Sequence, residues 1–209
     1  MRVIDARREP YPERPEPGGP GRPFPGPEAG AGWLDERMFD RRIVLVRGRV
    51  DATMASHVAS ALLVLGLSAP EPIQLYLSAP DGELAAAFAI VDAIDASAAP
   101  VHAVVTSEVG GAALAVLASA QRRLALAHAR VRLSEPRVGT VAGTADEVTA
   151  AAGRYLRELE EMVVRIAEVT GQPRSRVEDD LSTGRILTAG EAKEYGLIDE
   201  VVGREGAPQ

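Results

Sequence analysis

The chain has 209 residues, of which 46% are hydrophobic and 25% charged, so it can bury the core of a folded domain. Its 23 Lys and Arg against 30 Asp and Glu give a net charge of −7, which excludes the basic surface of a nucleic-acid-binding protein. It contains no Cys, which excludes disulfides, thiolate metal sites and cysteine nucleophiles. No apolar run is long enough for a membrane span or a secretory signal, so we expect a cytoplasmic protein without membrane contact.

The first 32 residues differ in composition from the rest of the chain. They hold 8 of the 15 prolines and 6 of the 20 glycines, and five Arg balance five acidic residues. Such a segment has little apolar surface to bury and cannot form a helix. We therefore predict a flexible N-terminal arm without a binding role over residues 1–32, a folded domain over 33–204 and a short tail over 205–209.

From Trp33 onward, strand and helix patterns alternate. β-rich runs predict strands, and apolar residues at helical spacing predict helices between them. Caps mark several helix ends: Asp51 before the first helix, Gly171 after the longest, and Thr188 with Glu191 as a capping box. The expected strands are 43–46, 73–77, 101–106, 124–126, 131–133 and 198–202, and the expected helices include 52–65, 112–120 and 146–170. This alternation predicts an α/β fold with a mostly parallel sheet.

Two loops follow predicted strands and are the candidates for a functional site. The first is Ser78 to Glu83 and the second is Ser107 to Ala112. Ligands of α/β sheets bind at the carboxyl ends of strands, and glycines let a backbone N–H approach a ligand closely. Two such loops side by side could form an oxyanion hole, although most glycine-containing turns are only turns.

The sequence resembles the Clp peptidase proteolytic subunit family (ClpP) from about Trp33 to Val202. The most specific stretch runs from Leu187-Thr188-Ala189-Gly190-Glu191 to Gly196-Leu197-Ile198-Asp199, which is similar to the family's "SAEEAKEYGLID" ending. The run from Ile73 to Gly82 is similar to "IYLYINSPGG", and the run from Ala129 to Pro136 is similar to "NSRVMIHQP". The resemblance implies the ClpP/crotonase-type fold, with flanking helices and a long protruding handle helix over 146–170.

The same resemblance places the family's catalytic Ser, His and Asp on residues without their chemistry. They fall on Gly111, Ser134 and Gly184, which offer no nucleophile at the first position, no general base and no carboxylate. The backbone oxyanion donors map to Gly82 and Ala112. No catalytic residue is therefore intact, and the resemblance implies neither a cofactor nor a metal.

Asp81 replaces the first glycine of the family's "PGG" and brings a carboxylate to the oxyanion hole, where it would oppose a developing negative charge. A relocated Ser–His pair is a weak alternative, because none of the three histidines is expected to neighbour Ser107, Ser119 or Ser134. We expect His57 on the surface of a helix, His102 inside a strand and His128 in a turn.

Three carboxylates offer an alternative chemistry. Glu83, Glu108 and Glu135 are expected to face the former cleft, where a pair with a raised pKa could do acid–base work. Solvated carboxylates on a chamber wall are the simpler interpretation.

The resemblance also implies partners. Family members stack heptameric rings through the handle helix and dock ATPase unfoldases in apolar pockets between subunits. The docking pocket maps to Tyr76, Val104, Leu126 and Val202, which stay apolar, whereas Gln74, Ala96 and Thr106 replace larger groups. We expect self-assembly into a heptameric ring, with an active paralogue as an alternative partner, and weak or lost docking of a Clp ATPase.

Three hypotheses follow. The first is a ClpP-like pseudopeptidase, a non-catalytic ring subunit or regulator of an ATP-dependent Clp protease. The second is an enzyme of other chemistry on the ClpP/crotonase scaffold, using the backbone donors with Glu108 or Glu135. The third is a serine peptidase that is active despite the mapped loss of its triad. Residues 111, 134 and 184 discriminate between the first and the third.

Overall fold

The computed structural model describes residues 34–137 and 142–203. Residues 34–39 form a short helix. The elements that follow are β1 (Ile43–Arg47), α2 (Ala52–Ser68), β2 (Ile73–Ala79), α3 (Leu84–Ala96), β3 (Val101–Gly110), α4 (Ala113–Ser119), β4 (Arg122–Leu126), β5 (Arg130–Leu133), α5 (Ala145–Thr170), α6 (Arg174–Thr183), β6 (Arg185–Thr188), α7 (Ala189–Tyr195) and β7 (Glu200–Val202).

One mostly parallel sheet organises the described chain. Its main path runs β1-β2-β3-β4-β7, and β5 pairs with the far end of β3 and with β6. Only the β5–β6 pair is antiparallel. The predicted α/β class with a mostly parallel sheet and flanking helices is confirmed.

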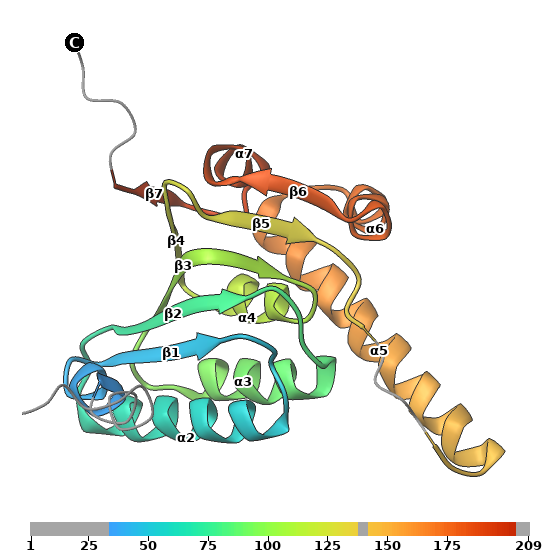
Figure 1. The fold of residues 1–209 in the computed structure, drawn as a ribbon, viewed down its shortest axis with the longest axis horizontal. Helices are drawn as coiled ribbons and strands as arrows, with labels where there is room; N and C mark the ends of the chain where they lie inside the picture. The colour runs from blue at the N-terminus through green and yellow to red at the C-terminus, as the bar shows by residue number, and fades with distance from the viewer. Residues whose placement is uncertain (1–33, 138–141, 204–209) are drawn as a thin grey trace, which may run out of the picture.

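Helices α2, α3 and α4 pack on one face of the sheet (Figure 1). Alternation along β2 shows why: Ile73, Leu75 and Leu77 are fully buried toward the helices, whereas Gln74 and Tyr76 are half-buried on the other face. Within the described residues, no helix covers that second face along β2 and β3. The core is therefore a two-layer core of aliphatic side chains and alanines.

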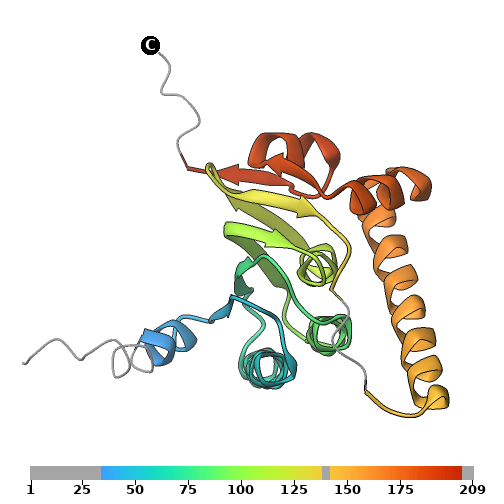
Figure 2. The ribbon, with the colours of Figure 1, turned by 45° about the vertical axis from the view of Figure 1, so that its right-hand side comes forward.

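Helix α5 leaves this core along its length (Figures 1 and 2). Its buried residues are Met162, Val163 and Ile166, all in the second half, whereas 145–150 is exposed throughout. A Thr144–Glu147 capping box begins the helix and Gly171, in the left-handed region, ends it. The two caps match the expected bounds to within one residue.

Asp199, directly before β7, adds side-chain hydrogen bonds to the pairing of that strand with β4. Its carboxylate accepts hydrogen bonds from the backbone N–H of Arg123, at 2.7 Å, and from the Arg123 guanidinium. Burial opposes ionisation, but these hydrogen bonds prevail and lower the pKa of Asp199.

Asp199→Asn is expected to lower the free energy of unfolding by about 1 kcal/mol at neutral pH, since solvent screens this partly exposed pair. The folded-state pKa is depressed, so the contribution is present above the unfolded value, near pH 4, and is lost as pH falls through the folded pKa. Urea unfolding from neutral pH downward should thus show a shallower acid loss in the variant. Glu200→Gln, at the exposed Arg122 pair, is the matched control; equal acid slopes in Asp199→Asn and wild type would refute the assignment.

No helix of the described part of the chain combines the length and apolar character required to cross a membrane.

Candidate functional site

Three segments meet at the carboxyl ends of β2, β3 and β5. A Cβ built on Gly110 would lie 3.0 Å from the carbonyl oxygen of Pro80 and 3.2 Å from Cβ of Arg132. One built on Gly111 would lie 3.2 Å from Oδ1 of Asp81 and 3.7 Å from Cα of Pro136. Gly111 itself has φ +54, in the left-handed region that favours glycine. The strand ends thus bring the 81–82, 111 and 134–136 segments together, where an α/β sheet places its sites.

Gly82 is held against Val50 at this junction. The N–H of Val50 donates to the carbonyl of Asp81 at 3.1 Å, and the N–H of Glu83 donates to the carbonyl of Val50 at 2.8 Å. A Cβ on Gly82 would lie 2.7 Å from that of Val50, so only glycine fits this close approach.

The carboxylate of Asp81 occupies the N–H of Gly82, which donates to Oδ1 at 2.8 Å. Two arginines flank the same carboxylate: Nε of Arg137 lies 3.4 Å and Nη1 of Arg49 lies 3.9 Å from Oδ2. An N–H that already binds a carboxylate does not stabilise a second oxyanion, because that anion would have to displace the first. The Asp81 carboxylate therefore lies against the N–H of Gly82, and its contacts with Arg49 and Arg137 were not anticipated from sequence.

Ser134 and Gly184 lie side by side on neighbouring chain segments. Leu133 of β5 pairs with Arg185 of β6 in an antiparallel register. Ser134, which follows Leu133, therefore lies opposite Gly184, which precedes Arg185. The N–H of Glu135 also donates to the carbonyl of Leu181 at 3.2 Å. Pro136, two residues after Ser134, adjoins Gly111, and Ser134 lies beside Gly184. None of the three side chains is an imidazole or a carboxylate.

One sequence expectation at this site is wrong. Ser107 to Gly110 was expected to be loop, whereas β3 continues to Gly110. Glu108, Val109 and Gly110 pair in parallel with Arg130, Val131 and Arg132 of β5. This distant pairing, rather than local β-propensity, makes the segment a strand. The loop is therefore confined to Gly111 and Ala112; Ala112 is fully buried and precedes α4.

The histidines lie where the sequence placed them. His57 is exposed on α2, His102 is half-buried within β3 opposite Gln74 and Arg122, and His128 is exposed before β5. Among the hydrogen bonds of residues 34–137 and 142–203, none joins a histidine to a serine. A relocated Ser–His pair thus has no support in the described residues.

No two of the three carboxylates considered for acid–base work form an interacting pair. Glu83 forms an ion pair with Arg49 at 3.2 Å, and Glu108 forms one with Arg132 at 2.6 Å. Glu135 is exposed. Burial raises the pKa of Tyr155, and the negative charge of Glu135 raises it further. Each carboxylate therefore has a separate environment. Nowhere in the described ranges do three His, Cys, Asp or Glu side chains gather as a metal site.

Comparison with known proteins identifies the family. The model of the Clp protease family matches residues 30–205. The chain belongs to the Clp protease family. It is 34% identical over 169 residues to the "ATP-dependent Clp protease proteolytic subunit 1" of Bifidobacterium longum (strain NCC 2705), covering 79% of this chain and 72% of the relative. It is 32% identical over 169 residues to the protein of that name from Rhodococcus jostii (strain RHA1), covering 79% and 77%.

In this Clp family member, the four residues expected to form a docking pocket lie in two neighbouring rows of the sheet, because Val104 pairs with Leu124, two residues before Leu126. Tyr76 lies opposite Val104, and Leu126 lies opposite Val202. Leu126 and Val202 are 39% and 38% exposed, whereas Val104 is buried. They line the face of the sheet that the described helices leave open.

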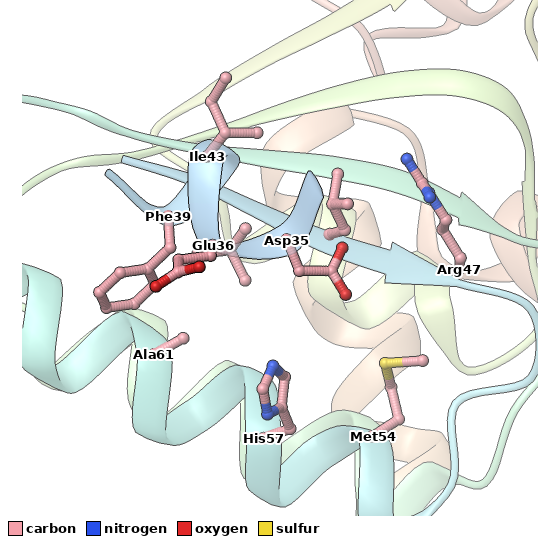
Figure 3. Close-up of a pocket in the computed structure, with 10 residues that line it drawn as sticks. Asp35, Glu36, Phe39, Ile43, Arg47, Met54, His57 and Ala61 are labelled. Atoms are coloured by element: carbon pink, nitrogen blue, oxygen red, sulfur yellow. The ribbon is translucent and has the colours of Figure 1, made fainter. Parts of the chain in front are cut away.

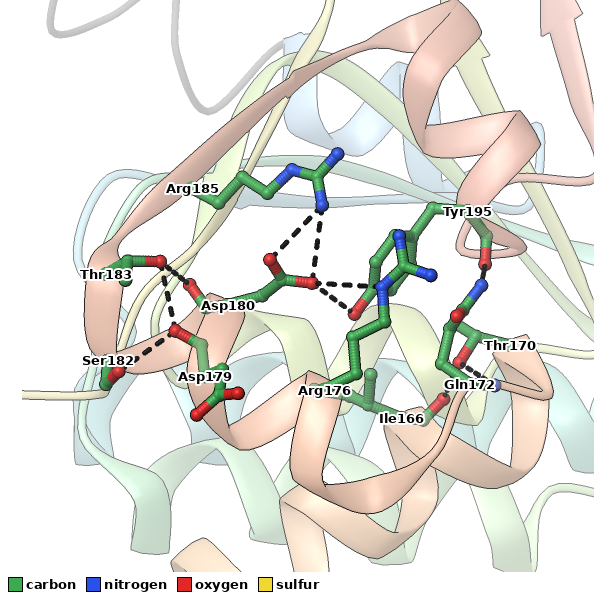
Figure 4. Close-up of polar contacts among 10 residues, drawn as sticks. All are labelled: Ile166, Thr170, Gln172, Arg176, Asp179, Asp180, Ser182, Thr183, Arg185 and Tyr195. Carbon is green, nitrogen blue, oxygen red and sulfur yellow. Dashed lines mark hydrogen bonds and ion pairs between the residues drawn. The ribbon is translucent and has the colours of Figure 1, made fainter.

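Asp180, in the last turn of α6 before Gly184, is the centre of a network of hydrogen bonds and ion pairs (Figure 4). The Tyr195 hydroxyl donates to Oδ2 of Asp180 at 2.9 Å, and Nη1 of Arg185 lies 3.2 Å from Oδ1. The guanidiniums of Arg176 and Arg185 lie over the Tyr195 ring, 5.6 and 5.9 Å from its centroid. Burial, followed by the bond to Asp180, raises the pKa of Tyr195 to about 12. The sequence did not indicate this network.

Tyr195→Phe should lower the free energy of unfolding by about 1–2 kcal/mol, because it removes a hydrogen bond to a charged acceptor. The raised folded-state pKa means that the hydroxyl's contribution is complete below pH 10 and is lost as pH rises through about 12. Denaturant unfolding at neutral and alkaline pH measures both effects. Tyr76→Phe, on the open sheet face, is the control, and identical alkaline losses in wild type and Tyr195→Phe would contradict the assignment.

Proposed function

We propose that this Clp family member is a ClpP-like pseudopeptidase, a non-catalytic ring subunit that shapes or regulates an ATP-dependent Clp protease. One observation carries the proposal: beside Gly111, the Gly82 N–H is bound to the carboxylate of Asp81 at 2.8 Å. Acyl transfer needs a nucleophile, a base and a free oxyanion donor. The mapped positions supply a glycine, a serine and a glycine, and one mapped donor is occupied.

Two alternatives remain to be compared. The relatives' names describe proteolytic subunits, which favours an active serine peptidase. That activity would need a hydroxyl paired with a base, and the described serines and histidines form no such pair. An enolate chemistry would use the same backbone donors and therefore meets the same Asp81 carboxylate.

The test of catalysis is labelling with a serine-reactive fluorophosphonate, together with a small-peptide cleavage assay. We expect neither labelling nor cleavage, with an active Clp proteolytic subunit as the positive control. Labelling that one serine substitution abolishes would refute the proposal. Turnover of an acyl thioester would instead support the second chemistry.

The assembly half of the proposal rests on the exposed surfaces of the fold. In one copy the open sheet face is only partly covered, with Gln74 and Tyr76 half-buried, and residues 145–150 of α5 are exposed. We propose that they contact other subunits in a ring, and that the partners are further copies or an active paralogue. Gln74 and Thr106 beside the mapped pocket predict weak docking of a Clp ATPase. Native mass spectrometry of the chain alone and mixed with an active paralogue tests this, and a monomer under both conditions would refute it.

A further inference from the structure

A groove runs along the first strand of the sheet. Its volume is about 410 Å³, and its walls are β1, α2 and the short helix 34–39 (Figure 3). Phe39, Met54 and Ala61 supply apolar surface, and Asp35, Glu36 and His57 supply polar groups. The groove lies at the amino-terminal limit of the described residues and is separate from the candidate site at the strands' carboxyl ends.

One wall of the groove is an unpaired strand edge. Within the described residues, β1 pairs with β2 alone. Gln74 N–H donates to the carbonyl of Arg42, and Gly48 N–H donates to that of Ser78, so the even-numbered residues of this stretch face β2. Neighbouring residues of a strand point their N–H and C=O groups to opposite sides, so those of Ile43, Leu45 and Arg47 face the open edge.

This edge lacks the usual protection against pairing. β1 has the sequence Ile-Val-Leu-Val-Arg, without Pro, Lys or an inward-pointing charge, and its side chains Ile43 and Leu45 are only half-buried. An apolar strand edge with free backbone groups pairs readily with another extended segment. The open edge of β1 is therefore a surface on which an extended segment can bind.

We propose that residues 1–9 of this chain bind in the groove as an added strand along β1. An added strand must donate backbone N–H groups, which proline lacks. Within residues 1–33, the run 1–9 is proline-free and carries the β-branched pair Val3 and Ile4, whereas 10–27 contains all eight prolines of the segment. This proposal departs from the expectation that the whole arm has no binding role.

The length of the connecting segment and the charge of residues 1–9 are both compatible with binding in the groove. Residues 10–33, even at roughly 3 Å per residue, span far more than the five-residue β1, so residues 1–9 can return to the groove. The short connection keeps the local concentration of the segment high. Residues 1–9 carry three Arg against two acids, and the groove carries Asp35 and Glu36 against Arg47. The opposite net charges favour binding.

Amide hydrogen exchange in the full-length chain tests the proposal. Residues 43, 45 and 47 report on the open edge, while 44 and 46, which bond to β2, report on the fold itself. We expect exchange at Leu45 to be at least about tenfold slower in wild type than in the double variant Val3→Asp/Ile4→Asp, with Val44 and Val46 unchanged. The matched control is Phe24→Asp, which removes an apolar side chain from the proline-rich stretch and should leave Leu45 protected.

Three outcomes would overturn the proposal. Equal exchange at Leu45 in wild type and the double variant shows an uncovered edge. Loss of protection in Phe24→Asp alone assigns the groove to a different segment. Protection that grows with protein concentration assigns it to another copy. If the double variant loses protection at Val44 as well, a second pair, Arg2→Glu/Arg7→Glu, repeats the measurement, and unchanged exchange at Leu45 in that pair counts against the proposal.

Discussion

Replacing Arg42 by Ala is expected to lower the free energy of unfolding by about 2–4 kcal/mol. Its guanidinium donates to three carbonyls: Leu65 at 3.0 Å, Ala69 at 3.0 Å, and Glu71 at 2.7 and 3.1 Å. These carbonyls belong to the last turn of α2 and the loop after it, so one side chain closes the helix end and fixes the start of β1. Arg42→Ala removes the donor from all three carbonyls, and the hydrogen bonds to Leu65 and Ala69 are partly buried.

The backbone at Arg42 provides a matched comparison. Its φ of +59 lies in the left-handed region, where an L side chain is strained. Arg42→Gly loses the same hydrogen bonds but relieves the strain, so it should be about 1 kcal/mol more stable than Arg42→Ala. Urea unfolding of both variants measures the difference. An Arg42→Ala variant within about 0.5 kcal/mol of wild type would show that the carbonyls do not depend on the guanidinium.

Removing the Asp81 carboxylate is expected to raise reactivity at the site about 10²–10³-fold once a triad is installed. The background is the triple variant Gly111→Ser, Ser134→His and Gly184→Asp. A side chain at residue 111 starts 3.2 Å from Oδ1 of Asp81, and the Gly82 N–H is already bound. The triple variant should therefore react slowly with a fluorophosphonate, and adding Asp81→Gly should free both the space and the donor.

Asp81→Asn on the same triple background separates charge from occupancy. Its amide oxygen can still accept from the Gly82 N–H, but it removes the negative charge, so its labelling rate should be intermediate. Circular dichroism and urea unfolding show whether each variant is folded. Equal labelling rates with and without the Asp81 substitution, including no labelling in either, would contradict this account of the hole.

The order of helices and strands was predictable because most of them are determined by residues close together in the sequence. Caps at Asp51, Thr188 and Gly171 and the apolar stripes of the helices depend on residues a few positions apart. Strand β6 and the end of β3 were missed because each is defined by pairing with β5, from a different part of the sequence. A four-residue strand such as Arg185–Thr188 has too little pattern of its own to be recognised.

The candidate site was predictable in position but not in its electrostatics. The motif around Asp81-Gly82 located the loop and the carboxylate, and both stand at the expected junction. The contacts of Arg49 and Arg137 with Asp81 could not be foreseen, because the three residues come from separate loops. Likewise, the groove beside His57 depends on the helix 34–39, whose short sequence gave no separate signal.

The projecting half of α5 has a thermodynamic consequence for the isolated subunit. Its outer turns are supported by the Thr144–Glu147 cap and by intrahelical hydrogen bonds, without tertiary packing around residues 145–150. A helical segment of this kind is marginally stable in water and unwinds from its free end. Contact with another subunit there would supply the missing stabilisation, so the outer turns of α5 would become fully helical only as the protein concentration approaches that of assembly.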